Sequence, residues 1–151
     1  MKTAYLGIVF VVLLAVGYFA ARYIQVGAET ALVVEVDDCD LAATACEGGL
    51  PDGTLVRLSV LPRPIPLMVP LRVEVQAAGG DWVPRRLDIT GLNMEMGLNR
   101  TSLKPDSEGR WQGETILPIC SQRRMHWQAS LLLEEGGDPV QLRFRFFTER
   151  P

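Results

Sequence analysis

The chain has 151 residues, of which 18 are acidic and 15 are Lys or Arg, so its net charge at neutral pH is −3. It contains no basic run of the kind that marks nucleic-acid binding. Repeats of 20–50 residues, which would indicate a solenoid, are also missing. About 120 residues follow the first apolar segment, which is enough for one buried core. We therefore expect one folded domain after a hydrophobic N-terminal segment.

The N-terminal segment over residues 4–21 has no charged residue. A helix of this length spans about 27 Å, close to the hydrocarbon thickness of a bilayer. We predict a membrane-spanning helix over residues 4–24, with residues 1–3 as a cytoplasmic tip. A cleaved signal peptide is the alternative, although its apolar core is usually only about 7–15 residues long.

The charges that flank this segment indicate its orientation. Lys2 precedes it, Arg22 follows it, and acidic residues dominate beyond residue 28. The positive-inside rule then places the C-terminal part outside the cytoplasm. We predict a single-pass inner-membrane protein with a domain over residues 30–151 in the periplasm.

Alternation of apolar and polar residues with a period of two dominates the chain after residue 30, and turn residues separate the alternating segments. This pattern predicts an all-β, immunoglobulin-like antiparallel β-sandwich of about seven strands, with a closed barrel as the alternative. The expected strands are Ala31–Asp37, Thr54–Leu61, Leu67–Ala77, Arg86–Thr90, Trp111–Leu117, Trp127–Leu133 and Val140–Thr148.

A cluster of prolines separates the second and third of these strands, at Pro62, Pro64, Pro66 and Pro70. Proline cannot donate to a strand ladder and fixes φ. We therefore expect residues 61–67 to be an extended connection that joins one sheet to the other.

Cys39 and Cys46 lie close together in a polar stretch, which suits a disulfide in an oxidising compartment. A redox-active or metal-binding dithiol is the alternative, although the spacing is not the C-x-x-C of thiol oxidoreductases. Cys120 is then left over. It could be a buried small hydrophobe, a soft-metal ligand, or a partner of one of the other two cysteines.

Met94 and Met96 flank Glu95, so in an extended backbone their thioethers lie on the same face. Thioethers are soft ligands that favour Cu(I). Met94 and Met96 are therefore a candidate cuprous site, and packing of these methionines in the core is the alternative.

Three further side chains could complete that site: Cys120, Met125 and His126, the only histidine of the chain. Arg100 follows the methionines closely, and we expect it to pair with Glu95 or Asp88 and to hold the turn in shape.

Features of an enzyme are missing from the sequence. It has no nucleophile elbow, no Gly-rich phosphate loop and no H-E-x-x-H motif. We therefore expect a protein without catalytic activity.

Several short motifs together resemble a known group of proteins. They are an N-terminal anchor, Cys39-Asp40-Leu41 with Cys46, Arg63-Pro64-Ile65-Pro66, Met94-Glu95-Met96-Gly97-Leu98-Asn99-Arg100 and Leu117-Pro118-Ile119-Cys120. The chain is similar in these motifs to small proteobacterial membrane-anchored periplasmic proteins of the YtkA-like and FixH-like families.

The resemblance implies an immunoglobulin-like domain that takes part in copper handling and cytochrome oxidase assembly, with Met94 and Met96 at the methionine positions of the motif. The usual H-x-M of copper carriers is missing. We accordingly predict an accessory factor that binds Cu(I), with a respiratory oxidase or a copper-delivery protein as partner. The alternative is a metal-free interaction module that docks on a membrane complex.

Overall fold

The computed structural model describes residues 11–18 and 31–150. Residues 11–18 form a helical segment, and Leu32–Pro151 is a compact unit by itself. Within the described residues, no helix combines the length and the apolar character that crossing a bilayer requires. Most of the anchor predicted over residues 4–24, the tip at residues 1–3 and the predicted domain start at residue 30 lie outside the described residues.

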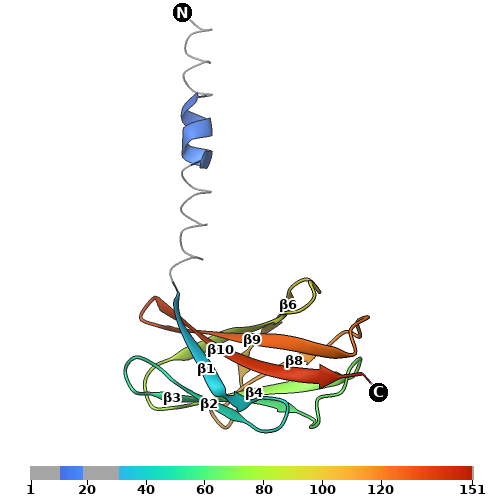
Figure 1. Cartoon of the computed structure of the whole chain (residues 1–151). Helices are drawn as coiled ribbons and strands as arrows, with labels where there is room; N and C mark the ends of the chain where they lie inside the picture. The colour runs from blue at the N-terminus through green and yellow to red at the C-terminus, as the bar shows by residue number, and fades with distance from the viewer. Residues whose placement is uncertain (1–10, 19–30, 151) are drawn as a thin grey trace, which may run out of the picture. The chain divides into compact units, whose positions relative to one another are not determined.

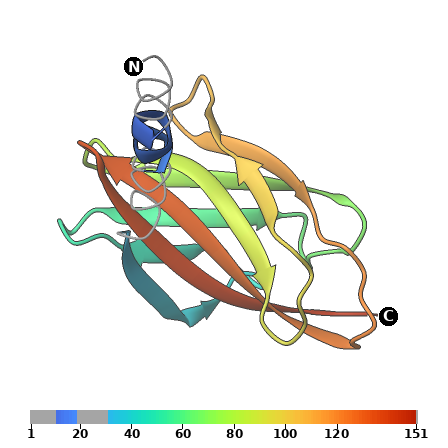
Figure 2. The same cartoon turned by 90° about the horizontal axis from the view of Figure 1, so that it is seen from above.

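The compact unit is a sandwich of β-sheets, as Figures 1 and 2 show, and this confirms the predicted all-β sandwich. It consists of two five-stranded sheets. Sheet A has the strand order β1-β10-β9-β5-β6 and sheet B the order β2-β3-β4-β8-β7. The strands are β1 (Leu32–Asp40), β2 (Cys46–Gly49), β3 (Leu55–Leu61), β4 (Pro70–Ala78), β5 (Val83–Gly91), β6 (Asn99–Ser102), β7 (Lys104–Pro105), β8 (Trp111–Ile116), β9 (Arg124–Glu135) and β10 (Asp138–Glu149).

All seven predicted strands have a counterpart among these ten. The three strands that were not predicted are β2, β6 and β7, which have only two to four residues each and are too short to show alternation. The prediction of a wholly antiparallel sandwich is wrong at one edge, because β1 pairs with β10 in parallel.

The predicted role of the proline cluster as a sheet-to-sheet connection is wrong. β3 and β4 are antiparallel neighbours in sheet B, so Pro62, Pro64 and Pro66 lie in a loop within one sheet, and Pro70 begins β4. This loop extends past the sheet, and the Met68 amide at its end donates to the Leu117 carbonyl (2.8 Å) in the β8–β9 connection. Four prolines restrict the backbone here without requiring the chain to change sheets.

The core lies between the sheets, on the inward faces of the alternating strands. Its largest side chains include Trp127, Phe144 and Phe146, which are at most 1% exposed. The Trp127 indole N–H donates to the Thr148 hydroxyl (2.8 Å), so the polar atom of this aromatic is satisfied inside the core.

The two sheets are joined on one side by the disulfide Cys39–Cys46, which confirms the predicted pairing. Cys39 lies near the end of β1 in sheet A, and Cys46 begins β2 in sheet B. Cys120 is a free thiol, so the alternative in which it pairs with one of the others is wrong.

On the opposite side, β6 of sheet A and β8 of sheet B are joined by side-chain hydrogen bonds. The Asn99 amide donates to the Ile116 carbonyl (2.7 Å) and accepts from the Thr115 hydroxyl (2.9 Å). The Thr101 hydroxyl donates to the Glu114 carbonyl (3.2 Å). These contacts satisfy carbonyl groups at the β8 edge that no neighbouring strand would otherwise use.

Candidate metal site at one end of the sandwich

The β5–β6 loop, residues 92–98, is fixed to the start of β9. The Leu92 amide donates to the His126 carbonyl (2.8 Å). The Asn93 side chain donates to the Arg124 carbonyl (2.9 Å) and accepts from the His126 amide (3.0 Å). Asn93 thus bonds β9 as a neighbouring strand would, and these bonds hold the loop at the end of the sandwich.

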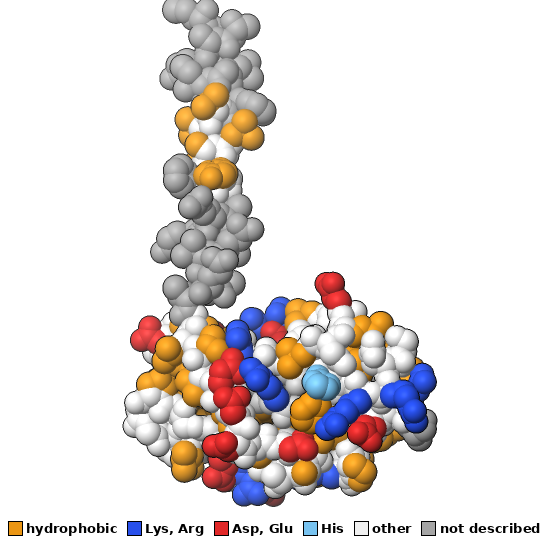
Figure 3. Space-filling view, viewed as in Figure 1, with side chains coloured by type: hydrophobic (Ala, Val, Ile, Leu, Met, Phe, Trp, Pro, Cys, Tyr) orange, Lys and Arg blue, Asp and Glu red, His pale blue; other side chains and the backbone are white. Residues whose placement is uncertain are grey.

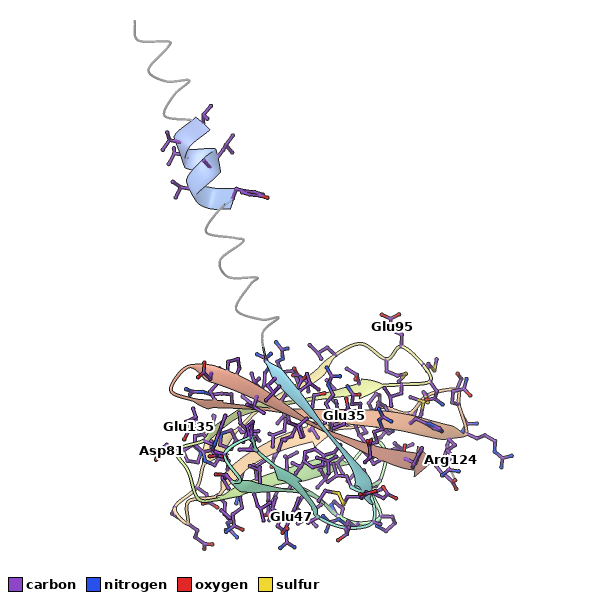
Figure 4. All side chains as sticks on the ribbon, turned by 60° about the vertical axis from the view of Figure 1, so that its left-hand side comes forward. Glu35, Glu47, Asp81, Glu95, Arg124 and Glu135 are labelled. Carbon is purple, nitrogen blue, oxygen red and sulfur yellow. A yellow bond between two sulfur atoms is a disulfide. The ribbon has the colours of Figure 1, made fainter. Side chains whose placement is uncertain are left out.

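Met94 and Met96 are both half-buried and pack against the core, whereas Glu95 between them is exposed. Figure 4 shows Glu95 at the tip of the loop, pointing away from the domain. The two thioethers therefore lie on the inner side of the loop.

Gly91, the last residue of β5, explains how the methionines approach one another. A Cβ atom at Gly91 would lie 3.1 Å from Met125 Cε and 3.4 Å from Met96 Cγ, and it would overlap the Met94 carbonyl oxygen. Only glycine leaves room for this arrangement. Met96 and the buried Met125 are thus neighbours below Gly91, with the Met94 backbone beside them.

Cys120 approaches the same loop from the β8–β9 connection. Its thiol is half-buried and donates to the Gln122 carbonyl (3.7 Å). The hydroxyl of the next residue, Ser121, donates to the Met94 sulfur (3.7 Å). Cys120 therefore directly precedes the residue that contacts Met94.

His126 does not join these sulfurs. It follows the buried Met125 on β9, and successive side chains of a strand point to opposite faces. The imidazole is exposed and meets the Phe147 ring edge-on, with centroids 4.5 Å apart. Figure 3 shows the histidine, in pale blue, at the surface. Of the predicted ligands, the structure places Met96 and Met125 beside Gly91 and the Met94 sulfur beside Ser121, the neighbour of Cys120, and it leaves His126 out.

An open groove of about 660 Å³ borders Met96 and is lined by residues of β6 and β8. Apolar side chains of Leu98, Ile116 and Pro118 line it together with Met96, and Leu98 and Ile116 are 57% and 48% exposed. This groove gives solvent or a partner a way to Met96 without opening the core.

Arg100 fixes the strand pair beneath the loop. Its Nε and Nη2 donate to the two oxygens of Asp88 at 2.8 and 3.0 Å, so of the two predicted partners it is Asp88 that binds it. These bonds and the carboxylate charge raise the pKa of Arg100. Because Asp88 and Arg100 are directly opposite on β5 and β6, the pair holds the base of the methionine loop.

The candidate donors are three thioethers and one thiol, which are soft ligands of the kind that bind Cu(I). Among the described residues, no group of three or more His, Cys, Asp or Glu side chains is placed to hold a metal ion. No family model matches the sequence, and no curated protein or solved structure is significantly similar to it.

Sequence reasoning did not identify Gly91 and Ser121 as parts of this site. A glycine at the end of a strand, directly before the methionine loop, was a usable signal of close approach. Ser121 carried no such signal, because its contact with Met94 depends on how two distant loops pack.

Proposed function

We propose that the protein is a membrane-anchored periplasmic accessory factor that binds Cu(I) and assists copper delivery or cytochrome oxidase assembly. The ligands are Met94 and Met96, with Met125 and Cys120 as further donors. The observation that supports this proposal most directly is the meeting of two loops at one end of the sandwich, where Ser121 contacts the Met94 sulfur and the Met96 and Met125 side chains flank Gly91.

The surroundings of these sulfurs suit transfer of the ion. Met94 accepts a long hydrogen bond from Ser121, and a thioether is a weak acceptor, so a metal ion would replace this contact at little cost. Half-burial restricts water, while the groove beside Met96 leaves a path for exchange. Thioethers are neutral, so ion release needs no proton uptake at these ligands.

The order of the strands supports an immunoglobulin-like assignment. In that fold, one sheet has the order A-B-E-D and the other contains C, F and G. The order β3-β4-β8-β7 corresponds to the first sheet, and β5, β9 and β10 correspond to the second. On this assignment β1 and β6 are additional edge strands of the second sheet.

The closed disulfide supports a location outside the cytoplasm, where such bonds persist. Together with the predicted membrane-spanning helix over residues 4–24, it favours an inner-membrane protein whose domain lies in the periplasm. A respiratory oxidase or a copper-delivery protein would be its partner there.

Competition for Cu(I) tests the proposal. The full chain, in detergent solution with ascorbate under anaerobic conditions, is titrated against a chromophoric Cu(I) chelator. Met94→Leu/Met96→Leu is expected to weaken binding at least tenfold. Met68→Leu is the matched control, because Met68 is an exposed methionine of the β3–β4 loop and should leave the affinity unchanged.

A second variant separates position from chemistry. Gly91→Ala keeps every sulfur but forces the Met94 carbonyl away from β5, so we expect a clear loss of Cu(I) affinity. Wild-type affinity in the double methionine variant, or no competition by the wild type, would reject the copper site.

The alternative, a metal-free interaction module, is favoured by a second groove at this end. It has a volume of about 660 Å³ and is lined mainly by apolar residues, among them Ile65, Met68, Ile119 and Phe147. Met68 has a φ of 60° and is 63% exposed, an unusual conformation that presents its side chain to solvent. Co-purification with a membrane complex that survives the double methionine substitution but not Ile119→Asp would support this alternative.

A further inference from the structure

A separate depression lies on the outer face of sheet B, over β3 and β4, and has a volume of about 280 Å³. Val56, Leu58 and Val60 of β3 are buried, so Arg57 and Ser59 point outward into it. The loop after β3 contributes Arg63 to its lining.

Arg63 forms the wall of this depression. It lies between Pro62 and Pro64, and its Nη2 donates to the Ser59 hydroxyl (2.8 Å). Its Nε is buried and has no hydrogen-bond partner in the described part of the chain. A guanidinium that is partly removed from water and bound to only one hydroxyl is stabilised by a nearby negative charge.

Two of the three arginines that line this pocket have no carboxylate partner. Across residues 31–150, eight arginines form ion pairs. Arg57, Arg63, Arg123 and Arg150 form none, and Arg57 and Arg63 line the same pocket. Two unpaired guanidinium groups therefore come together here from a strand and a loop.

The remaining lining residues restrict the ligand class. Arg110 contributes less positive charge, because Asp106 (3.0 Å) and Glu108 (2.7 Å) already bind it. Glu74 also lines the pocket and would repel a doubly charged anion. The net field is thus weakly positive and suits a single negative charge.

We propose that this arginine pocket, formed by Arg57, Ser59, Arg63 and Gln76, binds a small carboxylate. The planar guanidinium matches the carboxylate in geometry. Ser59 and Gln76 supply neutral hydrogen-bonding groups on the floor of the pocket. Its volume is just below the range of about 300–1,000 Å³ of typical small-molecule sites, so the ligand has few non-hydrogen atoms.

An NMR titration of the full chain in detergent solution with acetate tests this proposal. We expect saturable shifts of the Ser59 and Gln76 backbone amides. Arg63→Gln should weaken binding at least tenfold and Arg57→Gln severalfold. Arg123→Gln removes an equally unpaired arginine outside the pocket and should change nothing.

Two results would overturn the proposal. One is a titration in which the shifts at these amides do not saturate or in which acetate binds all variants with equal affinity. Acetate would then be an adventitious additive only. The other is tighter binding of inorganic phosphate than of acetate, which would show that the ligand class is wrong. If Arg63→Gln fails to fold, Arg57→Gln decides, because its exposed side chain can be replaced without disturbing the loop. Neither result depends on Cu(I) binding.

Discussion

The two sides on which the sheets meet are closed by different chemistry. On the β1–β2 side, a covalent bond joins Cys39 and Cys46. On the β6–β8 side, hydrogen bonds of Asn99 and Thr101 join the sheets, directly beside the loop that carries the methionines. A covalent link restricts the unfolded chain, whereas hydrogen bonds act only in the folded state. The side that carries the candidate metal site is therefore held by hydrogen bonds where the other side is held by a covalent link.

Removal of the disulfide is expected to have the largest effect on stability. The bridge closes a loop of eight residues, for which the chain-entropy estimate is about 2.5 kcal/mol. Cys39→Ser/Cys46→Ser should lower the free energy of unfolding by about this amount in urea, followed by tryptophan fluorescence. Cys120→Ser is the control, because this thiol is not in a bridge. An equal loss in both variants would mean that packing, not the link, is measured.

Asn99→Ala should have the next largest effect, about 2 kcal/mol, because it leaves the Ile116 carbonyl and the Thr115 hydroxyl without their partner. Asn93→Ala removes an asparagine that also makes two hydrogen bonds but is exposed, and should cost about 1 kcal/mol or less. Equal losses in urea unfolding would contradict a special role for the β6–β8 closure.

Thr101→Val removes one hydroxyl from the same closure while keeping the shape of the side chain. The Glu114 carbonyl loses its donor, and we expect a loss of about 1 kcal/mol in the free energy of unfolding. Thermal unfolding followed by circular dichroism measures this difference. A loss as large as that of Asn99→Ala would show that the hydrogen bonds act as one cooperative unit.

Neither closure contains a group that titrates, so the acid sensitivity of the domain should arise elsewhere. Hydrogen bonds from the Trp82 indole, and then from the Thr54 amide and hydroxyl, lower the pKa of Asp52 below its ordinary 3.8, although burial opposes this. A lowered folded-state pKa contributes stability above the ordinary value, which is lost as pH falls through the folded value.

The expected effect of Asp52 on stability is small. Between about pH 4 and pH 2, the free energy of unfolding should fall less steeply in Asp52→Asn than in the wild type. Burial raises the pKa of Asp106, but hydrogen bonds from the amides of Arg110 and Glu108 and from the Arg110 side chain lower it overall. Asp106 should therefore retain part of the pH dependence of stability in Asp52→Asn. Identical slopes in both proteins would contradict the assignment to Asp52.

The long strands of the fold were predictable because one face of each is buried. β10 is the clearest case, with Leu142, Phe144 and Phe146 inward and Arg143 and Arg145 more exposed. The parallel pairing of β1 was not predictable, since alternation within a strand says nothing about the direction of its neighbour. The connection made by the proline loop was not predictable for a related reason. Proline cannot donate to a strand ladder, but it does not determine to which sheet the next strand belongs.

The candidate site was predictable in part. Alternation along an extended backbone predicted that the side chains of Met94 and Met96 lie on the side opposite Glu95, because alternation is a property of adjacent residues. The exclusion of His126 follows from the same rule applied to β9, since Met125 is inward. What could not be predicted is the packing between loops, such as the contact of Ser121 with Met94, because it depends on the positions of two elements far apart in the chain.

The hydrogen bonds of Asn99 also have a practical consequence. Asn99-Arg100-Thr101 is an acceptor sequence for N-linked sugars, but the nitrogen that would carry the glycan donates to the Ile116 carbonyl. Glycosylation in a eukaryotic secretory host would have to precede folding, and the attached sugar would then keep β6 from meeting β8. Bacterial expression avoids this and is the appropriate source of protein for the measurements above.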